Sequence, residues 1–205
     1  AATISVALIY ENKGDDKTTE FQNYADQNWS VVRYAKFLNE HVSGSRIPIS
    51  VDENLAPWLR VNWDSLNAVE SKTRIHGASF SHKLHPHGEQ QYYELIGKYH
   101  QYQFGWSTYP LDANGVPVDN PNYLATIPQQ MRGYAAQRGN ANSYYNVASK
   151  AIIGIYVNHF LSSISAILSA AAFNKNLALN LQLERRDITL YESTYSPKFS
   201  LKYAF

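Results

Sequence analysis

The feature that most constrains the fold is an apolar run near the end of the chain. From Ala151 to Phe173 the sequence reads AIIGIYVNHFLSSISAILSAAAF, which contains no Asp, Glu, Lys or Arg. At about 1.5 Å rise per residue, a helix of this length is long enough to cross a bilayer. Its serines and small residues also suit close contacts between helices. The run therefore predicts either a membrane-inserted or membrane-apposed helix, or the buried central helix of a soluble bundle.

Further helices are expected upstream. Apolar residues recur at three- and four-residue steps from Thr18 to His41, which is the helical period. We also predict helices over residues 57–72, 89–102 and 124–138, the last interrupted by Pro128, with loops between them and a short strand over 46–51. The first ten residues, AATISVALIY, read as the tail of an apolar helix that begins upstream, and the polar stretch 11–16 interrupts it.

The C-terminal part changes period. Leucines alternate with other residues from Leu177 to Leu183, and alternation returns between Phe199 and Phe205. Strict alternation is typical of half-buried strands. We therefore predict a mainly α fold with a small C-terminal antiparallel β segment, its helices packed around Ala151–Phe173. We expect residues 1–205 to form a single domain, with a helical part (1–174) and a β part (175–205).

Composition excludes several function classes. The chain has 18 basic and 17 acidic residues and a net charge of +1, so no excess of positive charge is available for nucleic acid. It has no cysteine, which removes disulfides, thiolate nucleophiles and cysteine metal ligands. The phosphate-loop, dinucleotide, nucleophile-elbow and paired-histidine zinc motifs do not occur. We expect no cofactor and favour a non-enzymatic role.

Four histidines lie close together in the sequence. His82, His85 and His87 follow His76 within twelve residues and could offer several imidazoles to Zn²⁺ or Cu²⁺. The spacing matches no known zinc signature, and Pro86 makes the local geometry irregular. An exposed polar loop is the alternative interpretation.

Other polar residues are weaker candidates. Glu89, Glu94 and His100 could act as acid or base, but the two glutamates do not share a helix face and are expected to be surface carboxylates. The segment 112–119 resembles a calcium loop without its full pattern, and its Asn-Gly pair predicts a tight turn. The pair Asn158–His159 suits interhelical hydrogen bonding or a polar site within a membrane.

Tyrosine is abundant, with 16 residues, accompanied by 4 tryptophans. These rings suit interfaces where one end is dry and the other wet, although plain aromatic enrichment explains the number equally well. We assign partner contacts to the aromatic segments 92–109 and 123–145. The residues chosen are Tyr92, Tyr93, Tyr99, Trp106, Tyr144 and Tyr145.

Three separated blocks carry a resemblance. They are EFQNYADQNW (20–29), SHKLHP (81–86) followed by QQYYELIGKY (90–99) and Gly105-Trp106, and Val157-Asn158-His159 with Ser162, Ser165 and Ala166. In this order, from about residue 10 to 175, the chain resembles uncharacterised cell-envelope proteins of Bacteroidota and related bacteria. The resemblance implies an exported protein with hydrophobic helices and a small C-terminal β segment. Ser107-Thr108 stand where that family has acidic residues, so no role of this loop is carried over.

These observations favour a structural or accessory subunit of a bacterial membrane or cell-envelope assembly. We expect it to be membrane-associated on the periplasmic or outer-membrane side, with other envelope or membrane proteins as partners and no nucleic acid. The alternative is a metal-binding module or metal-dependent enzyme that uses His82, His85 and His87. A third hypothesis is a module that binds an apolar small molecule between its helices.

Overall fold

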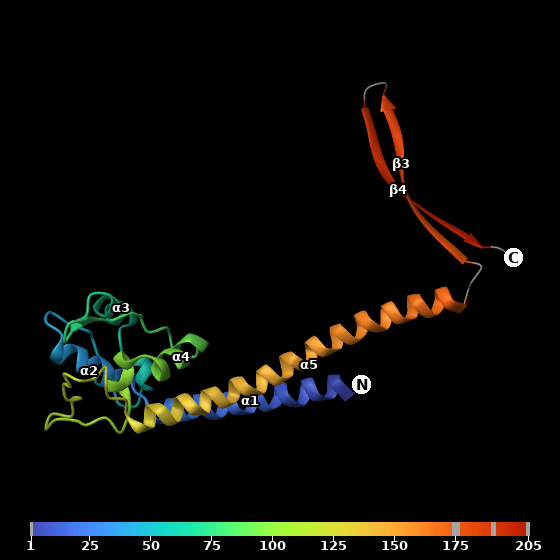
Figure 1. Cartoon of the computed structure of the whole chain (residues 1–205). Helices are drawn as coiled ribbons and strands as arrows, with labels where there is room; N and C mark the ends of the chain where they lie inside the picture. Colours follow the sequence, from blue (N-terminus) through green and yellow to red (C-terminus); the bar gives the residue numbers. More distant parts are fainter. Residues whose placement is uncertain (1, 174–176, 190–191, 204–205) are drawn as a thin grey trace. The chain divides into compact units, whose positions relative to one another are not determined.

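The computed structural model describes residues 2–173, 177–189 and 192–203 and divides the chain into two compact units (Figure 1). One unit comprises residues 5–149, and the other comprises residues 1–4 and 150–205. In chain order the elements are α1 (Ala2–Asn28), α2 (Val31–His41), the 3₁₀ helix η1 (Pro57–Leu59), α3 (Trp63–Glu70), β1 (Arg74–Ile75), β2 (Ala78–Ser79), α4 (Gln90–Lys98), the 3₁₀ helix η2 (His100–Gly105), α5 (Gln129–Phe173), β3 (Leu177–Thr189) and β4 (Glu192–Tyr203). The predicted class, mainly α with a C-terminal antiparallel β segment, is confirmed.

The helix predicted over 18–41 is two helices with a break at Trp29 and Ser30. Ser30 has an extended backbone and its Oγ accepts a hydrogen bond from the Arg33 backbone N–H, which caps α2. The first helix begins earlier than expected and passes through the polar stretch 11–16. Gly14 lies within this helix without interrupting it. A Cβ at that position would lie 2.6 Å from the Tyr145 ring. The missing side chain lets α1 and the first part of α5 approach closely.

The helix predicted over 57–72 is also shorter. Only η1 and α3 form, because Val61 between them pairs with Ile49 in an isolated β-bridge. Asn62 then starts α3, with its Oδ1 accepting from the Ser65 N–H at 2.8 Å. The strand expected over 46–51 is reduced to that bridge.

Two further boundaries differ from the sequence prediction. Residues 89–102 divide into α4 and η2, and the hairpin β1–β2 precedes them, its turn formed by His76 and Gly77 with positive φ. Pro128 does not break a helix but precedes one: α5 begins at Gln129 and continues to Phe173, which joins the last predicted helix to the charge-free run.

Aromatic side chains form the core of the 5–149 unit. The indole N–H of Trp29 donates to the Tyr102 carbonyl at 2.9 Å, and that of Trp106 donates to the Ile96 carbonyl at 3.1 Å. Rings of this kind bury large areas while their polar atoms stay paired. The largest buried rings are Trp29, Tyr34, Phe37, Tyr92, Tyr102, Phe104, Trp106, Tyr123 and Tyr134.

The charge-free run does not occupy the central position expected for it. Between residues 151 and 172, Ala151 and Ile155 are half-buried and all other side chains are exposed. The packing around this run that the sequence predicted is therefore replaced, in the described residues, by packing around the aromatic core. Among the described residues, none of the side chains from 151 to 172 is buried.

One carboxylate lies inside the aromatic core. Glu70 is 1% exposed; its Oε1 accepts from the Tyr34 hydroxyl at 2.9 Å and its Oε2 accepts from the Leu84 N–H at 2.8 Å. Burial raises the pKa of Glu70 to about 7, against the opposing effect of the hydrogen bonds from Leu84 and Tyr34. The residue connects α3 to α2 and to the loop before α4.

This raised pKa predicts a pH-dependent stability. The folded state holds the Glu70 proton more tightly than the unfolded chain, whose carboxyl has a pKa of 4.5, so the stabilisation present below pH 4.5 is lost as pH rises through about 7. Glu70→Gln keeps an acceptor for Leu84 and places a donor toward Tyr34, as the protonated acid does. Between pH 4.5 and 8 we expect the wild type to lose on the order of 3 kcal/mol relative to Glu70→Gln.

Urea unfolding followed by tryptophan fluorescence measures this difference, because all four tryptophans belong to the 5–149 unit. Glu53→Gln is the matched control: it removes an exposed carboxylate and should follow the wild-type pH profile. Parallel profiles for the wild type and Glu70→Gln would contradict the assignment.

Candidate functional site

The three histidines predicted as metal ligands each have a different partner. His82 Nδ1 lies 2.7 Å from Ser81 Oγ, His85 Nδ1 lies 2.9 Å from Glu89 Oε2, and His87 Nε2 lies 2.8 Å from Asp26 Oδ1. Within residues 2–173, 177–189 and 192–203, no group of three or more His, Cys, Asp or Glu side chains is placed to hold a metal ion. The metal hypothesis stays a prediction that this arrangement does not support.

His87 belongs to a polar cluster that joins α1 to the loop before α4. Its ring stacks on Trp58 with 3.6 Å between ring centroids and an interplanar angle of 1°. The Tyr93 hydroxyl lies 3.2 Å from both His87 Nε2 and Asp26 Oδ1. These contacts give His87 a structural role, whereas His85 makes an exposed ion pair with Glu89.

The aromatic residues predicted to contact partners fall into two groups. Tyr92, Tyr93 and Trp106 are at most 5% exposed, so they belong to the core and cannot form a partner surface. The sequence signal was misread because rings at helical spacing mark the inward face of α4 as well as they mark an interface. Tyr99, Tyr144 and Tyr145 are half-buried.

The last two of these tyrosines hold α5 against α1. The Tyr145 hydroxyl donates to Asp15 Oδ1 at 2.7 Å, and the Tyr144 ring lies 5.9 Å from that of Tyr10. Their packing within the 5–149 unit accounts for their position without a partner.

The acid–base and calcium candidates also have local partners. Glu94 pairs with Lys98 at 3.1 Å and with Arg138 at 3.0 Å, and the hydrogen bond from Lys98 lowers its pKa. A carboxyl shifted in that direction is a poor general acid. Asp112 Oδ1 accepts the N–H groups of Asn114 and Val116, so it closes the expected turn through backbone hydrogen bonds.

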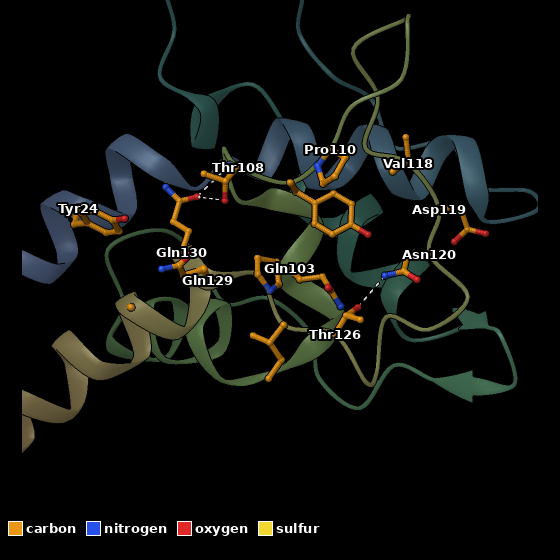
Figure 2. A pocket seen from close by; sticks show the side chains of 14 residues that line it. Tyr24, Gln103, Thr108, Pro110, Val118, Asp119, Asn120, Thr126, Gln129 and Gln130 are labelled. Atoms are coloured by element: carbon orange, nitrogen blue, oxygen red, sulfur yellow. Dashed lines mark hydrogen bonds between the residues drawn. The ribbon is translucent and has the colours of Figure 1, made fainter.

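A cleft of about 870 Å³ opens in the 5–149 unit (Figure 2). It is lined by Tyr24 of α1, Gln103 of η2, the loop from Thr108 to Pro128 and the start of α5. Apolar groups such as Tyr109, Pro110 and Ile127 alternate around it with amide and hydroxyl groups. The cleft combines an apolar lining with several hydrogen-bonding side chains, as ligand sites commonly do.

Gln103 lies within this lining and has an unpaired atom. The side chain is 1% exposed; its Nε2 donates to the His100 carbonyl at 3.0 Å and to the Tyr123 carbonyl at 2.8 Å. Both partners accept, which fixes the orientation of the amide. Its Oε1 is buried without a hydrogen-bond partner among the described residues. Sequence reasoning missed this residue; the available signal was a glutamine inside the aromatic run QYQFGW.

The helical segment of the unit that comprises residues 1–4 and 150–205 has a surface that differs from the polar cleft. Of the described helices, one contains a stretch long and apolar enough to cross a membrane, and it lies in α5. None of this stretch is buried, and its large apolar side chains, including Phe160 and Ile167, are exposed. The protein therefore carries an extended apolar helical surface.

The chain matches no protein-family model, no curated protein and no solved structure at a significant level. The resemblance to Bacteroidota envelope proteins thus stays a prediction. Two surfaces of the protein bear on its function, the exposed apolar helix and the polar cleft.

The contacts of the histidines predict their separate contributions to stability. His87→Ala removes a stacked, hydrogen-bonded ring and should destabilise the 5–149 unit by about 1–2 kcal/mol, whereas the matched change His85→Ala at an exposed position should stay within about 0.5 kcal/mol. Urea unfolding followed by tryptophan fluorescence compares the two. If zinc instead stabilised the wild type and each of the three His→Ala variants abolished that effect, the metal hypothesis would replace this account.

Proposed function

We propose that this protein is a membrane-anchored structural or accessory subunit of a bacterial cell-envelope assembly, with residues 151–173 of α5 inserted in the bilayer. The observation that supports the proposal most directly is the exposure of the charge-free helical segment between residues 152 and 172, with Ile155 half-buried. The resemblance to envelope proteins adds the periplasmic or outer-membrane side as its location. No catalytic step is part of the proposal.

The energetic argument rests on the exposed side chains. Transfer of one large apolar side chain out of water is worth roughly 1.5–3 kcal/mol, so a segment rich in them favours an apolar environment by more than about 10 kcal/mol in total. The exposed residues are Ile152, Ile153, Tyr156, Val157, Phe160, Leu161, Ile164, Ile167 and Leu168. A helix over 151–173 extends about 35 Å, enough for a hydrocarbon core of about 30 Å.

One polar residue of the segment has a hydrogen-bond partner within the helix. Ser163 Oγ donates to the His159 carbonyl at 2.8 Å, so this hydroxyl is paired within its own helix. Lys150 precedes the segment and Lys175 follows it in the sequence, where cationic side chains reach the membrane surfaces.

The segment has two faces of different chemistry. At 100° per residue, small and polar side chains gather on one face, which comprises Ala151, Gly154, Asn158, Ser162, Ser165, Ser169 and Ala172. The opposite face carries large apolar side chains such as Tyr156, Phe160 and Ile167. Small residues allow close backbone approach and Asn158 can hydrogen bond across helices, so we assign the small face to another transmembrane helix of the assembly and the large face to lipid.

The hairpin β3–β4 supports the subunit role independently. Its register places Leu181 opposite Phe199 and Leu183 opposite Pro197, and all three large side chains in these pairs are more than 60% exposed. The opposite face is polar, with Lys198 and Glu184 paired at 3.2 Å. Because an isolated two-stranded sheet is marginally stable in water, its apolar face is expected to be covered in the assembly.

The insertion is tested by placing a charge in the middle of the segment. Ile164→Asp should cost about 2.5–3.5 kcal/mol of insertion free energy and move the protein from the carbonate-resistant membrane fraction toward the soluble or degraded fraction. Asn146→Asp adds the same charge to α5 outside the segment and should leave fractionation unchanged. A wild-type chain released by carbonate without detergent would refute membrane insertion.

The partner face is tested with two serines that lie two residues apart. Ser165→Leu adds bulk to the small face and should shift the extracted complex to a smaller size on a native gel in mild detergent. Ser163→Leu makes the same change about 200° around the helix and should leave the complex intact. Equal effects of the two variants would argue against this face as the contact.

A further inference from the structure

We infer that the cleft beside η2 is a binding site for a neutral saccharide. The cleft lies wholly in the 5–149 unit, so this assignment does not depend on membrane insertion of residues 151–173. Its volume of about 870 Å³ falls in the range of small-molecule sites and accommodates a short oligosaccharide.

The charges around the cleft disfavour an anion. Among the described residues that line it, none is Lys, Arg or His, and the one carboxylate is that of Asp119. Phosphates and carboxylates are usually held by basic side chains, so nucleotides, phospholipid headgroups and acidic peptides match this lining poorly. Asp119 Oδ1 lies 2.8 Å from His76 Nε2, outside the lining. The lining therefore favours an uncharged ligand.

The lining also matches the two-sided chemistry of a sugar ring. A pyranose presents C–H groups on its faces and hydroxyl groups around its rim. Tyr109, Pro110 and Ile127 supply apolar surface for the faces. Figure 2 shows amide and hydroxyl side chains from several segments that line the same cleft. Burial raises the pKa of Tyr109 to about 12, so its hydroxyl keeps its proton near neutral pH.

Several of the polar groups are held in position by neighbours. Asn120 Nδ2 donates to Thr126 Oγ1 at 2.8 Å, while Asn120 Oδ1 accepts the Asn122 N–H. Gln130 Oε1 accepts from the Thr108 N–H at 3.1 Å and from the Thr108 hydroxyl at 3.0 Å. Such mutual hydrogen bonds fix side-chain rotamers before a ligand arrives, which lowers the entropic cost of binding.

The buried amide of Gln103 favours a polar ligand over an apolar one. Its unpaired buried Oε1 costs about 1–3 kcal/mol while it lacks a donor. Gln103 belongs to the lining of the cleft, so a ligand hydroxyl or acetamido N–H that reaches this oxygen would supply the donor, whereas a purely apolar ligand would leave it unpaired. The unpaired oxygen therefore favours a saccharide over a purely apolar ligand.

The test uses the full-length chain in lauryldimethylamine oxide micelles, because maltoside and glucoside detergents would compete for the site. Maltotriose, cellotriose and triacetylchitotriose are the probes, with N-acetyl-trialanine amide as a neutral peptide. Saturation-transfer NMR detects binding, and titration gives each Kd. We expect at least one of the three saccharides to bind in preference to the peptide.

Two matched glycine variants locate the binding. Gly133 and Gly139 both lie in α5, and a Cβ at either meets nothing within 4 Å, but only Gly133 lines the cleft. Gly133→Phe fills the cleft and should weaken binding at least tenfold, whereas Gly139→Phe should leave the Kd unchanged. Gln129→Ala at the cleft and Gln27→Ala at an exposed site on α1 form a second pair with the same expected contrast, in case either phenylalanine impairs folding.

Absence of binding by all three saccharides would overturn the inference. So would a stronger signal from the peptide, which would assign the cleft to peptides, or an equal loss in Gly133→Phe and Gly139→Phe, which would place the binding elsewhere.

Discussion

The contact between Trp29 and the backbone of η2 holds the 5–149 unit together. The indole lies directly against Gly105, where a Cβ would collide with the ring, and its N–H donates to the Tyr102 carbonyl. The next residue continues the contact, because the Ser30 N–H donates to the Gly105 carbonyl. A single interaction thus sets where α1 ends, where α2 begins and where η2 lies. Since Tyr24 precedes this junction on α1 and Gln103 belongs to η2, the same contact fixes two sides of the cleft.

Two buried polar groups show how the aromatic core tolerates polarity. Glu70 receives hydrogen bonds at both oxygens from Tyr34 and Leu84, and burial still raises its pKa to about 7. Gln103 has both protons of its amide nitrogen engaged by carbonyls but no donor for its oxygen. The first group has its full set of partners within the protein and therefore acts as a structural link. The second does not, and Gln103 belongs to the lining of the cleft for which a saccharide is proposed.

The features that could be predicted from the sequence depend on local periodicity. The C-terminal hairpin was predicted because alternation from Leu177 to Leu183 is a short-range signal, and the long helix was predicted because the charge-free run is continuous. The break at Trp29 was missed because the apolar period passes across it without a glycine or proline. Whether Tyr92 and Trp106 face a partner or a core depends on which residues pack over them, and the unpaired state of Gln103 depends on Tyr123, 20 residues away. No pattern within a single window contains that information.

The two units differ in how much of their apolar side-chain surface they bury. In the 5–149 unit the large rings are buried, the Trp29 indole donates to a carbonyl and the Tyr34 hydroxyl donates to Glu70, so the unit supplies its own apolar environment. In the other unit the helix over 151–172 and the hairpin pairs around Leu181 and Phe199 expose apolar side chains. Ser163 and Glu184, in contrast, have local hydrogen-bond or ion-pair partners. A segment that exposes this much apolar surface suits contact with lipid or with apolar protein surfaces better than contact with water. This asymmetry supports the proposed division of the protein into a membrane-anchoring part and a folded part with the cleft proposed to bind a saccharide.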